Sequence, residues 1–159
     1  MTPIDTSGGP AGNVDAGFRS GRLWGALVIV EFFNLLSAVG GGVALVTSRG
    51  LGMPLSLLER SPFDSFTGPG IILAGVVGGT HATAIVFALV NRRLALAAAA
   101  VAAFGMILWI YVEVSMLLVY HWLQTVYFVT GIAQLVIVLL LLGVLPKLPG
   151  AVRAGARAE

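Results

Sequence analysis

Four long apolar runs decide what this chain can fold into. They cover residues of about 23–46, 69–90, 94–120 and 125–145, and most charged residues lie outside them. Because a helix rises about 1.5 Å per residue, each run is long enough to cross a hydrocarbon core of about 30 Å. Continuous apolar runs are not the short alternating strands of a barrel, so only helices would satisfy their backbone in lipid. The sequence predicts an all-α fold, a bundle of four transmembrane helices.

The composition agrees with a membrane protein and excludes several other classes. Hydrophobic residues make up 58% of the 159 residues and charged residues only 10%, which lies outside the range of soluble domains. With no cysteine, the chain has no disulfide, thiolate metal site or CxxC redox pair. We therefore expect the lipid bilayer as its surroundings. The net charge of +2 comes from basic residues beside the runs, which indicates topology and no nucleic-acid partner.

These basic residues fall on one side of a four-span chain. They precede the first run, form the second connection and follow the fourth run, as Arg19, Arg22, Arg92, Arg93, Lys147, Arg153 and Arg157. The positive-inside rule then places both termini in the cytoplasm (N-in/C-in) and the loop between the first two spans on the exported side.

Three regions follow from this pattern. Residues 1–18 are rich in Gly, Pro, Ser, Thr and Asp, so we expect a disordered N-terminal tail. Residues 19–147 form the transmembrane domain, and residues 148–159 form a basic C-terminal tail. Because the N-terminus lacks a basic n-region and the first run is long, we expect that run to be retained rather than cleaved as a signal peptide.

The exported loop carries signals of local structure. Residues 54–58 have too few apolar residues to span a membrane and too many for a solvated linker, which predicts a short interfacial helix. Ser61-Pro62 resembles a helix start and predicts a further short turn, and Pro69 is expected to begin the second span. We expect a folded cap that packs Phe63 or Phe66 onto the bundle.

Four polar residues within the spans share one depth. Glu31, Asn34, His81 and Gln134 lie about 12 to 16 Å from the cytoplasmic ends of their spans. Helical spacing places them on faces rich in small residues, which favours an orientation into the bundle, and an acid facing lipid would be costly. The pattern predicts that Glu31 and His81 approach within direct or single-water hydrogen-bonding reach.

This cluster has two interpretations. Glu31 and His81 could bind a proton or ion, because ionisable groups at this depth are functional candidates. The alternative is interhelical glue, in which the polar groups share hydrogen bonds of about 1 kcal/mol or less each. One histidine and one carboxylate are too few ligands for a metal, so no metal site is expected.

A separate acid, Glu113, lies in the outer third of the third span beside Trp109. It could belong to a site entered from the exported face, or it could be a partly solvated acid bonded to a tyrosine. The chain has no Ser-His-Asp arrangement, Gly-rich phosphate loop or HExxH motif. We therefore expect no catalytic residues, no enzyme activity and no cofactor.

Small residues predict where the first two spans pack. Gly75 and Gly79 form a GxxxG motif in the second span, and Gly41 lies in a small-residue stripe of the first. Because such stripes let helix backbones approach closely, we expect these three glycines at the contact between the two spans.

Several of these features together resemble a known group. They are Val-Glu near the start of the first span, a Gly-Gly-Gly turn towards its end, Ser61-Pro62-Phe63, Pro69-Gly70, Gly78-Gly79, and Trp109 four residues before Glu113. Over residues of about 23–145 the chain resembles small four-span bacterial integral membrane proteins of unassigned function. The resemblance implies this fold and a bacterial inner-membrane location, without an activity.

Two functions stay open. The first is a non-catalytic accessory or interaction component, which contacts a second copy or a larger membrane complex. The second is a small proton- or ion-coupled carrier that uses Glu31 and His81 and needs dimerisation. A closed polar cluster favours the first function, and a cluster open to water favours the second.

Overall fold

The computed structural model describes residues 11–117 and 119–144, with side chains from residue 20 onward. Every regular element in these residues is helical. Four helical stretches are long and apolar enough to cross a membrane: Ser20–Thr47, Thr67–Val90, Arg92–Leu117 and Trp122–Leu141. The prediction of an all-α chain with four such helices is confirmed, and the helix ends differ from the predicted ones by a few residues.

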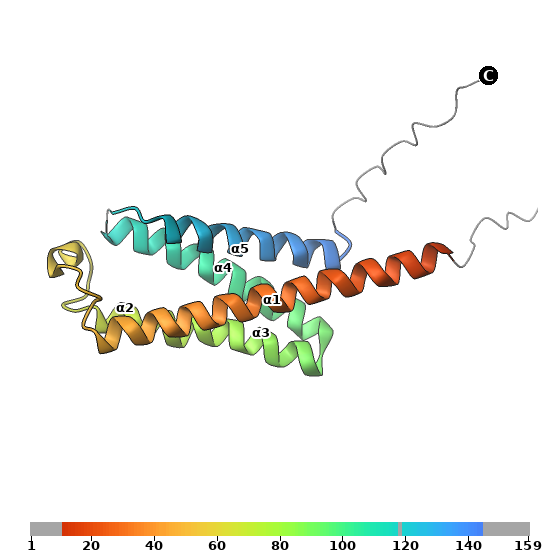
Figure 1. Cartoon of the computed structure of the whole chain (residues 1–159), viewed down its shortest axis with the longest axis horizontal. Helices are drawn as coiled ribbons and strands as arrows, with labels where there is room; N and C mark the ends of the chain where they lie inside the picture. Colours follow the sequence, from red (N-terminus) through yellow and green to blue (C-terminus); the bar gives the residue numbers. More distant parts are fainter. Residues whose placement is uncertain (1–10, 118, 145–159) are drawn as a thin grey trace, which may run out of the picture.

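The helices run up and down in chain order. Helix α1 (Ala11–Thr47) is followed by a second long helix, formed by α2 (Thr67–Ile71), the π-helical segment η2 (Ile72–Val77) and α3 (Gly78–Val90). Helices α4 (Arg92–Leu117) and α5 (Trp122–Leu141) complete the bundle. Both α1 and α4 pack against α3 and against α5, so the four long helices form a closed ring in cross-section. Figure 1 shows the helices running lengthwise along the bundle.

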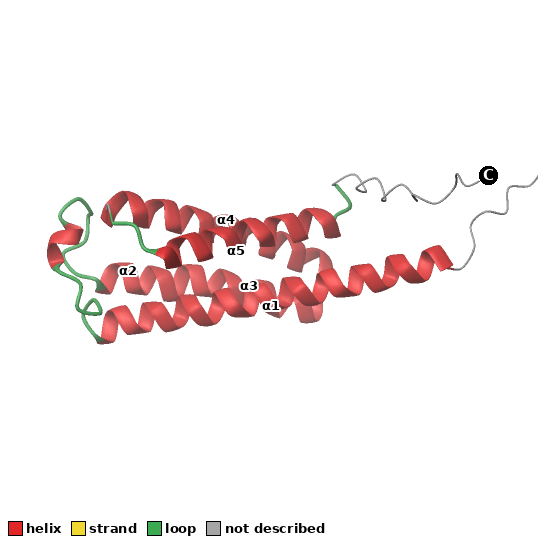
Figure 2. Ribbon diagram, turned by 45° about the horizontal axis from the view of Figure 1, so that its top comes forward, coloured by secondary structure: helices red, strands yellow, loops and turns green. Residues whose placement is uncertain are grey.

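The two ends of the bundle differ, as Figure 2 shows. One end, here called the loop end, carries the connection between α1 and α2 with its short 3-10 helix η1 (Leu55–Leu58), and also the connection between α4 and α5. The opposite end, here called the terminal end, carries the turn at Asn91, the start of α1 and the end of α5.

Helix α1 begins earlier than the sequence predicts. It starts at Ala11, so residues 11–18 are helical. The prediction of a disordered tail over residues 1–18 is therefore wrong for residues 11–18. A helix already nucleated by a long apolar run adds further residues at little cost, which explains the extension. Residues 1–10 and the expected tail 148–159 lie outside the described residues.

The loop end is folded as predicted. Helix η1 lies within the predicted short helix at residues 54–58, and Phe66 is 3% exposed, which confirms that one of the two phenylalanines packs onto the bundle. Gly50, with φ of 108°, lies directly against the Phe66 ring, where a Cβ atom would collide. The position therefore requires glycine both for its backbone conformation and for space.

The Ser61-Pro62 segment forms a bend rather than a helix. The Ser61 hydroxyl donates to the Leu58 carbonyl at 2.9 Å and accepts from the Phe63 amide at 3.2 Å. The second long helix starts at Thr67, two residues before the predicted start at Pro69. Pro69 then occupies the first turn, where its missing N–H removes no helical hydrogen bond.

The glycine prediction is wrong at two of three positions. A Cβ atom on Gly41 would touch Leu73 at 3.5 Å, but a Cβ on Gly75 or Gly79 would meet nothing within 4 Å. Those two glycines instead line an open groove between α3 and α4, together with Thr83. The reason is geometric: Gly79 and His81 are two positions apart, about 200° around a helix, so both cannot face α1.

The close approach between α1 and the second long helix occurs at Gly42 and Gly70. A Cβ atom on Gly42 would lie 2.5 Å from the Gly70 carbonyl oxygen and 2.7 Å from Ala74. Further along, a Cβ on Gly78 would lie 2.8 Å from Val39. The face that carries Gly70, Ala74, Gly78 and His81 is therefore the one that packs on α1.

Candidate functional site

A hydrogen-bonded network of polar side chains lies within the bundle, between its two ends. Glu31 Oε2 on α1 is 2.6 Å from His81 Nδ1 on α3. The other oxygen, Glu31 Oε1, accepts from Gln134 Nε2 on α5 at 2.7 Å. One carboxyl group therefore joins three helices, and the predicted contact between Glu31 and His81 is confirmed as a direct one.

The network continues to α4 and along α1. Gln134 Nε2 also donates to the Ala99 carbonyl oxygen of α4 at 2.8 Å, and Gln134 Oε1 accepts from Asn34 Nδ2 at 3.2 Å. Asn34 Oδ1 in turn accepts from the Thr130 hydroxyl at 3.0 Å. All four long helices contribute at least one group, so the network connects the whole cross-section of the bundle.

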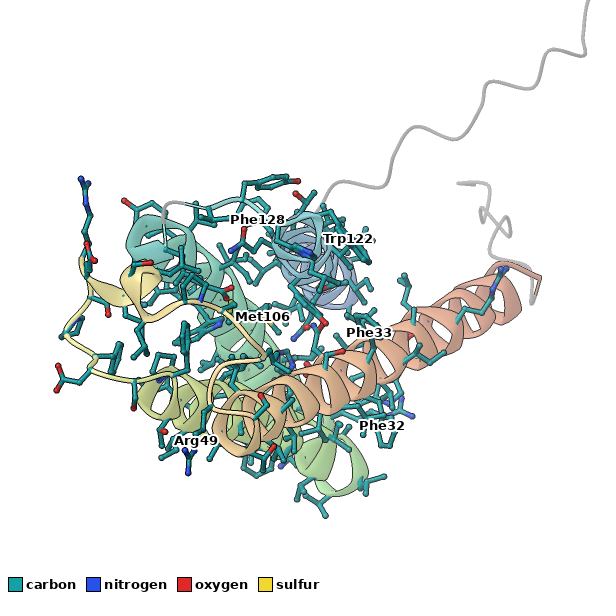
Figure 3. All side chains as sticks on the ribbon, turned by 60° about the vertical axis from the view of Figure 1, so that its left-hand side comes forward. Phe32, Phe33, Arg49, Met106, Trp122 and Phe128 are labelled. Carbon is teal, nitrogen blue, oxygen red and sulfur yellow. The ribbon has the colours of Figure 1, made fainter. Side chains whose placement is uncertain are left out.

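Packing closes the network on all sides. Glu31 is 2% exposed, and Asn34, His81 and Gln134 are fully buried. One apolar cluster, which includes Ala38, Met106 and Trp109, covers the side towards the loop end, and another, which includes Leu27, Ala84 and Val138, covers the side towards the terminal end. Figure 3 shows Met106 of α4 among the helices, with Phe32 and Phe33 on different sides of α1.

The sequence builds this site through helical spacing and small side chains. Glu31, Asn34 and Ala38 follow one another at steps of three and four, so they share one face of α1. The alanine-rich part of α4 lies opposite, where Ala99, Ala102 and Ala103 are at most 1% exposed. Alanine leaves room there for the longer polar side chains of the other three helices.

The contact between Glu31 and His81 uses only one of the two imidazole nitrogens. His81 Nδ1 faces the carboxyl group of Glu31, whereas the buried Nε2 has no partner among the described residues. Either partner can supply the proton of this contact, because an imidazole nitrogen donates or accepts according to its tautomer and a protonated carboxyl group also donates.

Glu113 lies apart from this network, near the loop end. Its Oε1 accepts from Gln124 Nε2 at 3.2 Å, and Gln124 Oε1 accepts from the His121 amide at 2.9 Å. Gln124 thus takes the place of the tyrosine that was expected to bond to Glu113. Tyr120 is hydrogen-bonded to Thr125 instead, and Tyr111 is 69% exposed.

Sequence reasoning missed Gln124, which is 5% exposed. Its signal was present in the spacing, because Gln124, Tyr127, Gly131 and Gln134 follow one another at steps of three and four on one face of α5. His121 caps α5: its Nδ1 accepts from the Leu123 amide at 3.3 Å.

A cavity of about 510 Å³ adjoins Glu113 and Trp109 at the loop end. Its lining reaches Ala38 and Met106, but Glu31, Asn34, His81 and Gln134 do not line it. Within the described ranges 11–117 and 119–144, no three His, Cys, Asp or Glu side chains gather into a possible metal site. The described chain thus has a closed polar network and a separate, largely apolar cavity.

Comparisons with known proteins add no relative to this picture. No family model matches the chain, and neither the curated proteins nor the solved structures contain a significant match to it.

Proposed function

We propose that this chain is a non-catalytic, multi-pass component of the bacterial inner membrane, an accessory or interaction protein. In this proposal the buried polar network is structural and holds four helices in register. The observation that carries it is closure: the four predicted polar residues are at most 2% exposed, and apolar clusters cover them from both ends. Protons or ions moving through such a site would require a path that breaks this packing.

A second candidate is a proton-coupled carrier. The observation that favours it is the short contact of 2.6 Å between Glu31 and His81, combined with an unpartnered Nε2 among the described residues. A carboxyl and an imidazole in direct contact can exchange a proton, which is the chemistry that proton-coupled transport uses.

Proton flux into liposomes separates the two functions. We expect protein reconstituted into vesicles that contain a pH-sensitive dye to pass protons no faster than empty vesicles under an imposed potential, because the network is closed. The Glu31→Gln variant should give the same trace. Flux above that of empty vesicles, lost in Glu31→Gln while the variant stays folded, would replace the accessory function with the carrier.

The proposed topology places both termini in the cytoplasm and the loop end on the exported side. It rests on the basic residues at the terminal end, where Arg92 lies over the Trp24 ring at 5.0 Å, and on the positive-inside rule. We expect a reporter that fluoresces only in the cytoplasm to be active when fused to the C-terminus. A matched fusion in the loop between α1 and α2 should be inactive, and the reverse pattern would refute this topology.

A further inference from the structure

The cavity at the loop end has the size and walls of a small-molecule site. It lies between α1, α4, α5 and the loop segment that contains η1, and its volume is about 510 Å³. Binding pockets for small molecules typically span about 300 to 1,000 Å³ and are mostly apolar. Met53, Met106 and Met116 contribute to the lining, and methionine adapts readily to the shape of an apolar ligand.

One corner of this cavity carries an unsatisfied donor. Trp109 is 8% exposed, and its Nε1–H lies beside the Glu113 carboxyl group without a hydrogen bond of normal geometry to any described residue. A buried indole N–H normally has a partner, because leaving it unpaired costs free energy. Since Trp109 lines the cavity, an acceptor atom on a bound molecule could accept a hydrogen bond from its N–H.

The same corner carries an acceptor. Glu113 follows Trp109 by one helical turn on α4, and both residues line the cavity. The hydrogen bond from Gln124 at 3.2 Å holds the Glu113 carboxyl group in place. Since a carboxylate accepts several hydrogen bonds, Glu113 keeps capacity for a donor on a ligand.

A hydroxyl is the simplest head group that satisfies both residues. A hydroxyl accepts from the Trp109 N–H and donates to Glu113 through the same oxygen atom. An ammonium group has donors only and leaves the Trp109 N–H unpaired. A carboxylate would place a second acid beside Glu113 in an apolar cavity, where like charges disfavour each other.

We propose that this cavity binds an aliphatic or isoprenoid alcohol. The hydroxyl lies at Trp109 and Glu113, and the apolar chain lies against the methionine and leucine side chains. This site goes beyond the proposed accessory function and does not depend on it, because the cavity and the polar network have no residue in common among Glu31, Asn34, His81 and Gln134.

Equilibrium binding of tritiated dodecan-1-ol to the full chain in lipid nanodiscs tests the proposal, with empty nanodiscs as the blank. We expect saturable binding at one site per chain. Unlabelled dodecanoate and dodecylamine should compete on the order of tenfold less well than unlabelled dodecan-1-ol, because neither satisfies both polar groups. Competition with farnesol and with 1,2-dioctanoylglycerol identifies the source of the hydroxyl. Tighter binding of farnesol indicates a free alcohol, and tighter binding of the diacylglycerol indicates a lipid with a free hydroxyl.

A matched pair of variants tests the polar corner. Trp109→Phe keeps an aromatic ring, although a smaller one, and removes the N–H, so it should fold and bind dodecan-1-ol roughly three- to tenfold more weakly. Trp122→Phe makes the same change on the outside of α5, at a residue 62% exposed (Figure 3), and should bind as the wild type does.

A third variant tests the cavity itself without touching the polar corner. Leu57→Trp, on η1, should fill the cavity from the loop and abolish saturable binding while the helical content stays unchanged. Three results would each overturn the proposal: no saturable binding above empty nanodiscs, wild-type affinity in Trp109→Phe, or dodecanoate competing as well as the alcohol.

Discussion

Glu31→Ala is expected to lower the free energy of unfolding by about 3 to 5 kcal/mol. The carboxyl group accepts from Gln134 at 2.7 Å and contacts His81 at 2.6 Å. Its removal leaves these buried groups without their partner and opens a void at a position only 2% exposed. Unfolding in mixed micelles, with an SDS titration followed by circular dichroism, measures the change.

The contribution of the pair itself comes from a double-mutant cycle with His81→Ala. Since the two side chains touch directly, the single changes should be non-additive, with a coupling energy of about 1 to 3 kcal/mol. Glu31→Ala combined with Val129→Ala, a change at an exposed position of α5, is the matched control and should be additive. Additivity within about 0.3 kcal/mol for Glu31 and His81 would mean that the contact contributes nothing to stability.

Gly42→Leu is expected to destabilise the bundle by about 3 kcal/mol or more, because it overpacks a contact between two backbones. A single added Cβ atom would already lie 2.5 Å from the Gly70 carbonyl oxygen and 2.7 Å from the Ala74 backbone nitrogen. Neither atom belongs to a flexible side chain, so α1 and the second long helix must move apart. Thermal unfolding in detergent should show a lower midpoint.

Gly79→Leu is the matched control. Nothing lies within 4 Å of a Cβ atom at this position, and leucine has a higher helix propensity than glycine by roughly 0.8 kcal/mol. The variant should therefore unfold at the wild-type temperature or slightly above it. If Gly79→Leu proved as destabilising as Gly42→Leu, the face with Gly75 and Gly79 would be the packed one, and the arrangement of α1 against α3 described above would be wrong.

The glycines show where sequence periodicity stops being informative. Spacing correctly groups Gly75, Gly79 and Thr83 on one face of the second long helix, and Ala74, Gly78 and His81 on another. Both faces are rich in small residues, and either could pack against a neighbour. The neighbouring helix decides which face is packed. Helix α1 places Gly42 and Glu31 against the face with Ala74, Gly78 and His81, and the face with Gly75, Gly79 and Thr83 lines a groove beside α4.

The polar network was far more predictable, for a physical reason. Polar side chains are rare within the apolar runs, so helical rise fixes their depth and helical spacing fixes their shared face. Residues at equal depth that all avoid lipid have few ways to be arranged, and the direct contact of Glu31 with His81 follows. The Thr130 hydroxyl and the Ala99 carbonyl also join the network, but threonines and backbone carbonyls occur throughout the spans, so the sequence does not single these two out.

The sequence by itself determined the four long helices, their order and the residues that meet at the centre of the bundle. Hydrophobic length and helical spacing are local properties, and they are enough for these features. Only the tertiary structure decided which glycine face is packed, that Gln124 holds Glu113, and that a cavity opens beside Trp109. These features depend on how neighbouring helices fill space against one another, because a void or a backbone contact belongs to no single segment of the chain.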